Sequence, residues 1–275
     1  MSIATPPLNF AQLNTRVEEA ARDLRVPALR VRRMLCTHIV SQMLPDAVAI
    51  KGGMGVKLRM GERGTRATAD LDISTLRRGE EFEEVFTADV KPRPLHDPGL
   101  AQPQYVMHPY RVTLSFLGKE WGGLDVEVSD PEVEPHAHSR RQIDGELIEL
   151  SDRFGFGALR PVELIELEYQ IAQKIHALTD PDYSRAHDLV DLQLLWAADP
   201  DLDVAREYCV RTFDFRRAQK WPPLPVRTMD GWEPAYQLSR EETEVGGDSL
   251  VLADIGSARE WFKQIITSLN EPAAT

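Results

Sequence analysis

The alternating segment ADLDIST, residues 69–75, constrains the fold more than any other part of the sequence. Leu71 and Ile73 alternate with Asp70 and Asp72, which predicts a strand with one apolar face and one face carrying two carboxylates. Two carboxylates this close repel each other, and a divalent cation relieves the repulsion. The segment therefore predicts a site for Mg²⁺ or Mn²⁺, although alone it also fits the solvated face of an ordinary strand.

Two neighbouring segments favour the metal site. The run AVAIKGG, residues 47–53, predicts a short strand that enters a tight turn, where glycines let backbone N–H groups approach phosphate oxygens. Residues 110–118 and 124–130 predict a β-hairpin connected by KEWGG. Asp125 and Glu127 share one face of its second strand, and either could be a third carboxylate. Such a triad suits phosphoryl or nucleotidyl transfer.

The rest of the chain divides into two regions. Residues 131–160 predict a loop-rich segment with some strand, and residues 76–104 predict a charged helix followed by a long Pro-rich loop. Ser184 is the expected N-cap of the helix that follows it. Helices are expected at residues 9–45, 161–180, 184–198, 200–220 and 255–269. We therefore expect an α+β core in residues 1–158 and a mostly helical domain in residues 159–275 that completes the site.

Composition narrows the function classes. Lys and Arg number 32 against 44 Asp and Glu, a net charge of −12, so the chain is not a general polyanion binder. It contains no apolar run long enough for a membrane helix and no signal-peptide pattern at its beginning. Cys36 and Cys209 lie far apart, and His136 and His138 lack a third ligand, which argues against zinc. These features predict a cytoplasmic protein without membrane association.

The layout resembles the polymerase-β-like nucleotidyltransferases, whose signature is a Gly-[Gly/Ser] turn followed by DxD. Two blocks make the resemblance more specific: KGGMGVKLRMGERGTRATADLDI at 51–73 and QIAQKIHALTDPDYSRAHDLVDLQLL at 170–195. Together they resemble the AbiEii/AbiGii toxin family. The resemblance implies a mixed sheet with helices, followed by a mostly helical region. The turn Gly52-Gly53 lacks the serine of many nucleotidyltransferases, so no role is carried over from that serine.

The resemblance also implies roles for individual residues. Asp70 and Asp72 match the metal-binding DxD, and Glu127 matches the third carboxylate, with Asp125 as the alternative. Lys174 and Asp188 match the catalytic lysine and the late catalytic aspartate. The expected substrate-binding residues are Lys51, Gly52, Gly53, Arg66, Thr68 and Arg185.

The implied reaction is Mg²⁺-dependent transfer of a nucleoside monophosphate from an NTP to an acceptor hydroxyl, with release of pyrophosphate. The implied acceptor is RNA, at the 3′ end of tRNA, and the implied partner is a cognate antitoxin. One alternative is a non-catalytic nucleotide- or RNA-binding module on the same fold. Another is a kinase-like phosphotransferase, although the chain lacks GxxxxGK[ST] and the HRD/DFG motifs.

Several further residues keep two interpretations. The histidines His176 and His187 are either proton carriers or structural residues. The tryptophans Trp221 and Trp232 either stack on bases or pack internally. Asp191 either pairs with Arg185 or caps a helix. Three basic runs are solvated helix faces in the simplest interpretation, and the two that follow the N-terminal run are also candidate tracks for tRNA or a nucleotide. They comprise Arg22, Arg25, Arg30, Arg32 and Arg33; Lys51, Lys57, Arg59, Arg63 and Arg66; and Arg211, Arg216, Arg217 and Lys220.

Overall fold

The computed structural model describes residues 4–45, 48–75, 90–92, 107–133, 140–142, 145–181, 185–226, 229–243 and 250–271. Their strands form one mixed sheet in the order β3-β4-β5-β2-β1-β7-β6. The strands are β1 (Val48–Ile50), β2 (Asp70–Thr75), β3 (Val90–Pro92), β4 (Met107–Phe116), β5 (Lys119–Ser129), β6 (Arg140–Gln142) and β7 (Val162–Leu164). The helices are α1 (Phe10–Leu24), α2 (Ala28–Met43), α3 (Gly52–Met60), α5 (Gly145–Phe154), α6 (Leu167–Leu178), α7 (Ala186–Trp196), α8 (Leu202–Arg216), α9 (Trp232–Glu241) and α10 (Ile255–Asn270).

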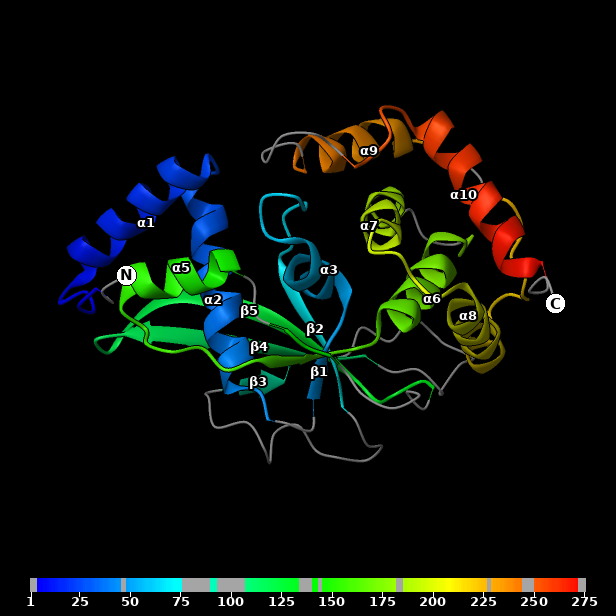
Figure 1. The fold of residues 1–275 in the computed structure, drawn as a ribbon. Coiled ribbons are helices and arrows are strands. Elements are labelled where there is room, and N and C mark those ends of the chain that lie inside the picture. The colour runs from blue at the N-terminus through cyan, green and yellow to red at the C-terminus, as the bar shows by residue number, and fades with distance from the viewer. Residues whose placement is uncertain are drawn as a thin grey trace.

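The helices gather at the two ends of the sheet (Figure 1). Helices α1, α2 and α5 lie at one end, α6 to α10 lie at the other, and α3 lies between them over the sheet. The buried hydrophobic residues form three clusters. One joins α1, α2 and α5, one lies between the sheet and helices α2 and α3, and one lies among α6 to α10. The α+β fold class predicted from the sequence is confirmed.

Strand β2 confirms the alternation on which the sequence analysis depends. Leu71 and Ile73 are fully buried, whereas Asp70 and Asp72 lie on the opposite, partly exposed face. Strand β5 runs parallel to β2, with Asp70 opposite Asp125 and Asp72 opposite Glu127. The sheet therefore places four carboxylates in two adjacent rows.

The hairpin is confirmed, but its connection is shorter than expected. The turn consists of Leu117 and Gly118, whose φ angles are 48° and 74°, and KEWGG belongs to β5. A two-residue turn with positive φ matches the twist of paired strands, which favours this register. The expected helix at 9–45 is likewise two helices, because Arg25 adopts a left-handed conformation and Pro27 precedes α2.

Two expected boundaries are wrong. The segment 131–160 contains helix α5, whose Leu147, Leu150 and Phe154 pack inward at helical spacing. The expected helix at 161–180 begins at Leu167, because Leu164 pairs with Ile50 in the sheet. Since β7 joins the sheet from beyond residue 158, the division into 1–158 and 159–275 stays a prediction.

The remaining helices agree closely with expectation. Helices α8 and α10 begin after Asp201 and Asp254, whose side chains cap them, and α9 is a helix that the sequence did not predict. Cys36 and Cys209 are buried free thiols. No helix in the described ranges is long and apolar enough to cross a membrane. Ser184, His136, His138 and most of 76–104 lie outside the described residues.

Candidate active site

A cavity of about 190 Å³ lies where the start of α3 and strands β2 and β5 meet helices α6 and α7. It brings together seven residues that the sequence singled out from separate segments. They are Lys51, Gly52, Asp72, Glu127, Lys174, Arg185 and Asp188. Met107, Gln170, Gln173, Ala177 and Arg216 complete the lining. One face of α6 carries Gln170, Gln173, Lys174 and Ala177. The spacing of the three polar residues on this face could have been recognised from the sequence.

The turn before α3 is held against the DxD strand. Gly52 has a φ of +59°, and a Cβ built there would lie 1.8 Å from Oδ2 of Asp72. The backbone N–H of Lys51 donates to the carbonyl of Asp72 at 2.9 Å. No described side chain caps the start of α3. The N–H groups of its first turn are therefore available to an anion beside the carboxylates.

Replacing Gly52 by alanine is expected to lower activity at least about 100-fold, because the added methyl group displaces the Asp72 carboxylate. Left-handed backbone at a non-glycine residue also costs about 1–2 kcal/mol of stability. Gly118→Ala is the matched control, since Gly118 has a φ of +74° and open space around its Cβ position. Thermal unfolding should show similar losses for both variants, whereas only Gly52→Ala should lose activity. Equal activity in both would contradict this role of Gly52.

The carboxylates of β2 and β5 are not equivalent. Glu127 and Asp72 line the cavity, whereas Asp70 and Asp125 are not among the lining residues. Asp125 forms an ion pair with Arg111 at 3.0 Å. Burial, followed by the charges of Asp72 and Asp70, raises the pKa of Glu127. This face therefore carries excess negative charge, which fits a divalent cation with oxygen ligands. Glu127 is better placed than Asp125 to be the third carboxylate.

The described residues contain no three His, Cys, Asp or Glu side chains drawn together as a preformed metal cluster. Three carboxylates without a cation repel one another, which keeps their oxygens apart. A cation held by Asp70, Asp72 and Glu127 would draw these oxygens closer together. The donor set fits the cation in charge and in chemistry, although the ligand oxygens are not preassembled.

Lys174 lies at the centre of a buried ion-pair network. Its Nζ donates to Oδ1 of Asp188 at 2.5 Å and to Oδ2 of Asp191 at 2.7 Å. Asp191 in turn accepts two hydrogen bonds from Arg66, at 2.9 and 2.8 Å. Burial lowers the pKa of Lys174, but Asp188 and Asp191 outweigh burial and hold it above its ordinary value. Lys174 is therefore charged, and it is held in place by two aspartates.

The other expected substrate residues occupy two different environments. Arg185 is 44% exposed and lies 3.5 Å from Asp188 at the start of α7. Arg66 does not line the cavity; it contacts Asp191, which the sequence had paired with Arg185 or with a helix cap. Thr68 lies beside Gly53, where an added Cβ would meet its Oγ1 at 2.7 Å. Arg66 and Thr68 thus support the turn rather than the cavity wall.

Glu132 was missed by the sequence analysis. It is 3% exposed and accepts hydrogen bonds from Arg216 at 2.5 and 2.9 Å, and from Gln173 at 2.8 Å. Arg216 and Gln173 both line the cavity, so Glu132 fixes one of its walls from behind. The isolated glutamate after β5 carries no sequence pattern that marks it, because Arg216 lies 84 residues away.

One of the two candidate basic tracks is largely internal, and the other is only partly exposed. Lys57 pairs with Glu62 at 2.8 Å in the interior, Arg59 bonds Gln170, and Lys51 donates to Ser129 at 2.7 Å. Arg63 alone in that run is well exposed, and it pairs with Glu146. These contacts leave most of the run 51–66 internal, so it is not an exposed RNA track, whereas a nucleotide contact by Lys51, which lines the cavity, stays a prediction. In the second run, Arg216 is internal, whereas Arg217 and Lys220 remain exposed.

The aromatic and imidazole candidates are mostly structural. Trp232 is 2% exposed, so it packs in the core and is not accessible to a base. Trp221 packs edge-on against Phe213. Burial, followed by the charge of Arg216, lowers the pKa of His176 to about 3, so this residue is neutral and a poor proton carrier at neutral pH. Burial also lowers the pKa of His187, which lies 3.5 Å from Asp188.

Acidification is expected to destabilise the protein through His176. The unfolded residue titrates near 6.5 and the folded one near 3, so below pH 6.5 only the unfolded chain binds the proton. Stability that is fully present above pH 6.5 is therefore lost as pH falls toward 3, by about 2 kcal/mol between pH 7 and pH 5. Urea unfolding at both pH values should show about 2 kcal/mol less acid loss for His176→Gln. An unchanged acid loss in that variant would contradict the assignment.

The comparisons with known proteins agree with this architecture. The nucleotidyltransferase toxin MenT4 of Mycobacterium tuberculosis H37Rv superposes with a TM-score of 0.55 at 17% identity, covering 94% of this chain and 90% of that chain. JHP933 of Helicobacter pylori gives a TM-score of 0.42 at 14% identity, covering 94% and 91% of the two chains. A putative nucleotidyltransferase of H. pylori gives 0.39 at 14%, covering 96% and 100%. No curated protein sequence matches.

The fold shared with MenT4 is that of a nucleotidyltransferase. The family model described as nucleotidyl transferase AbiEii toxin, Type IV TA system, matches residues 33–261. This match covers most of the chain, so the chain belongs to the AbiEii family of nucleotidyltransferase toxins from toxin–antitoxin systems.

Proposed function

We propose that this chain transfers a nucleoside monophosphate from an NTP to an acceptor hydroxyl at the 3′ end of RNA, with tRNA as the acceptor and pyrophosphate as the second product. The observation that carries this proposal is the shared cavity. It places the glycine turn of α3 and the carboxylates Asp72 and Glu127 against Lys174 and Asp188 of the helical region. Those are the groups that bind a triphosphate beside a cation.

Asp70, Asp72 and Glu127 are the proposed ligands of Mg²⁺, or of Mn²⁺. When bound, the cation neutralises charge on the phosphate oxygens and on the attacking and leaving oxygens. The excess negative charge that raises the pKa of Glu127 supports this role, because a cation would remove its cause.

The cationic side of the cavity is proposed to hold the triphosphate. The uncapped N-terminus of α3 offers backbone N–H groups, and Arg185 adds a partly exposed guanidinium. Lys174 has three N–H donors, of which Asp188 and Asp191 take two, so one is left for a phosphate oxygen. This arrangement retains Lys174 as a fixed point charge rather than as a mobile side chain.

Asp188 is proposed to hold Lys174 in place and also to orient the substrate. Its Oδ2 is buried and lies 3.5 Å from Nη1 of Arg185 without a hydrogen bond, so it can still accept one. Burial raises the pKa of Asp188, but Lys174 outweighs burial and lowers it, which makes the carboxylate a weak base. It can therefore accept a hydrogen bond from a substrate hydroxyl without removing its proton.

A cognate antitoxin and a cytoplasmic location belong to the same proposal. The toxin family implies an antitoxin partner, and NTPs and tRNA meet in the cytoplasm. The net charge of −12 opposes general binding to nucleic acid, so the acceptor must be recognised locally.

The test uses total RNA and each NTP in turn, labelled at the α- or the γ-phosphate. We expect the α-label to enter tRNA, the γ-label to appear in pyrophosphate, and both results to depend on Mg²⁺. Release of nucleoside diphosphate with γ-label on the acceptor would instead indicate a kinase. Metal-dependent NTP binding without either product would indicate a binding module. Asp125→Asn is the matched control and should retain activity, because Asp125 lies outside the cavity.

A further inference from the structure

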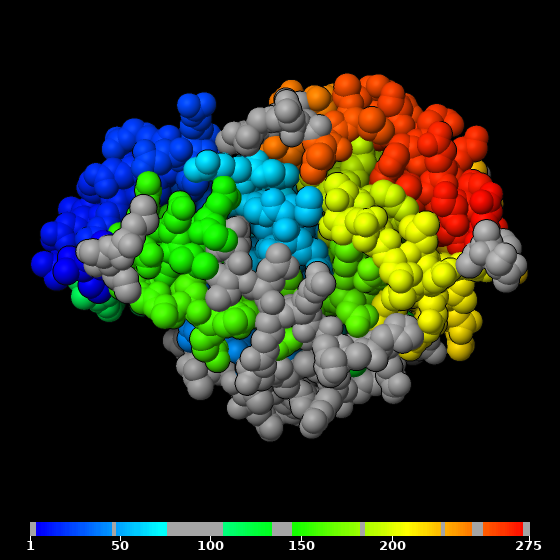
Figure 2. All heavy atoms as spheres, in the orientation of Figure 1, coloured from blue at the N-terminus to red at the C-terminus, as the bar shows by residue number. Residues whose placement is uncertain are grey.

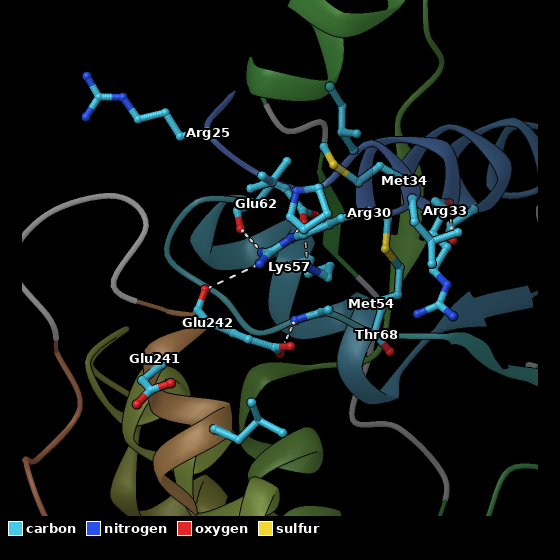
Figure 3. A pocket seen from close by; sticks show the side chains of 17 residues that line it. Arg25, Arg30, Arg33, Met34, Met54, Lys57, Glu62, Thr68, Glu241 and Glu242 are labelled. Atoms are coloured by element: carbon cyan, nitrogen blue, oxygen red, sulfur yellow. Dashed lines mark hydrogen bonds and ion pairs between the residues drawn. The ribbon is translucent and has the colours of Figure 1, made fainter. Parts of the chain in front are cut away.

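A second and larger cavity, of about 370 Å³, lies between α2, α3 and α9 (Figure 3). Its size is within the usual range for a small-molecule or nucleotide site. In the space-filling view, the surface of residues 52–69 lies between the blue N-terminal helices and the orange α9 (Figure 2). The cavity is thus formed by three parts of the chain that are distant in sequence.

The linings of the two cavities come close together at the first turn of α3. Gly52 lines the first cavity, and Met54, two residues later, lines the second. Thr68 also lines the second cavity, and it precedes Asp70 of the DxD strand by two residues. A chain-like ligand would therefore have to pass only this turn between the second cavity and the first.

The charges of this cavity form an inner and an outer set. Arg30 and Lys57 share one carboxylate, Glu62, at 2.8 Å, and the inner set is balanced only when the second lining carboxylate, Glu242, is counted with it. Glu242 is held by the backbone N–H of Ala67 at 2.8 Å. Arg25 and Arg33, in contrast, are exposed and extend outward from this centre, and no other described residue bonds their guanidinium groups (Figure 3).

The mouth of the cavity is apolar between these arginines. Leu29 of α2 is 59% exposed and Leu238 of α9 is 62% exposed. Exposed leucines next to arginines that no described residue bonds suit a ligand that combines apolar groups with repeated phosphates. The exposed Glu241 opposes such a ligand, but two guanidinium groups outweigh it.

We infer that the second cavity binds the single-stranded 3′ segment of the RNA acceptor, with Arg25 and Arg33 on its phosphates and Leu29 and Leu238 against its bases. This inference rests on the proposed function, since it names the path by which the acceptor reaches the first cavity. It also gives the N-terminal basic run a role other than a solvated helix face. An acidic peptide would use the same arginines, and the test below distinguishes it from RNA.

The test measures the affinity of fluorescein-labelled single-stranded RNA by anisotropy, without NTP, at several salt concentrations. Arg25→Gln/Arg33→Gln should weaken binding about tenfold and make the slope of log affinity against log salt about 1.4 less steep, since each lost phosphate contact contributes about 0.7. Leu29→Gln/Leu238→Gln should weaken binding without changing the slope, because apolar contacts release no counterions. Glu241→Gln should strengthen binding.

Arg217→Gln/Lys220→Gln is the matched control, because it removes the same charge from the exposed part of the second basic run. It should leave RNA affinity unchanged. An equal loss in the control, or wild-type affinity in both cavity variants, would overturn the inference. Binding of an acidic peptide in place of RNA would overturn it as well.

Failure of the proposed function would give a different experimental result from failure of this inference. NMP transfer to RNA that continues normally in the cavity variants overturns only the acceptor site. A wild-type protein that transfers no nucleotide overturns the proposed function, whereas the anisotropy series still decides whether this cavity binds RNA. NTP binding at the first cavity should be the same in every variant of the second.

Discussion

Asp72→Asn is expected to reduce nucleotidyl transfer by on the order of 10³-fold, because a cation at the proposed site would supply about 4 kcal/mol of transition-state stabilisation. Asp72 lines the first cavity, faces Glu127 across the β2–β5 pair and lies against the Gly52 turn. Asparagine retains the shape but removes the charge. The variant should therefore fold normally, since it also removes repulsion with Asp70.

Three measurements check this prediction. Transfer is measured with α-labelled NTP, Mn²⁺ binding by paramagnetic resonance, and folding by thermal unfolding. Asp125→Asn is the control from the same sheet face, and it should leave both activity and Mn²⁺ binding intact because Asp125 pairs with Arg111. If Asp72→Asn binds Mn²⁺ as tightly as the wild type, Asp72 is not a ligand.

Asp191→Ala is expected to destabilise the protein by about 3–5 kcal/mol, the usual cost of removing one partner from a buried ion pair. Asp191 is 1% exposed and neutralises both Lys174 and Arg66, so its loss leaves two buried cations with a single carboxylate, Asp188. The burial of these cations is costly without their partner, and unfolding relieves that cost.

Urea unfolding at neutral pH measures this loss. Asp23→Ala is the control, because it removes an exposed ion pair with Arg153 and should cost no more than about 1 kcal/mol. Arg66→Ala combined with Asp191→Ala should cost less than the sum of the two single variants, since they share one interaction. A loss below 1 kcal/mol for Asp191→Ala would show that the network is not a stabilising feature.

Local patterns predicted most of the fold. The strand at 70–75 and helices α8 and α10 were predicted because their periodicity and caps lie within a few residues. The three-residue strand β7 could not be predicted in this way. Its pairing with Ile50 depends on a partner more than 100 residues earlier in the chain, which no local pattern reports.

The candidate site likewise combines residues that the sequence predicted with contacts that it could not predict. Two sequence blocks predicted Asp72, Lys174 and Asp188, and the fold brings all three to one cavity. Charge pairing across the fold could not be predicted, because Arg66 meets Asp191 at a separation of 125 residues. For the same reason, the basic run at 51–66 gave a wrong expectation of an exposed surface, since its neutralising partners are visible only in three dimensions.

The contact between Arg66 and Asp191 has a consequence for protein synthesis. The DxD strand emerges from the ribosome long before α7, and until α7 emerges Arg66 has no Asp191 to bind. The Lys174 side of the cavity is also absent during that interval. For the proposed site, a nascent or truncated chain that ends before α7 lacks Asp188 and cannot complete the pocket, so such a chain is expected to be inactive. On this proposal, the fold itself delays the activity of a harmful product until most of the chain has been made.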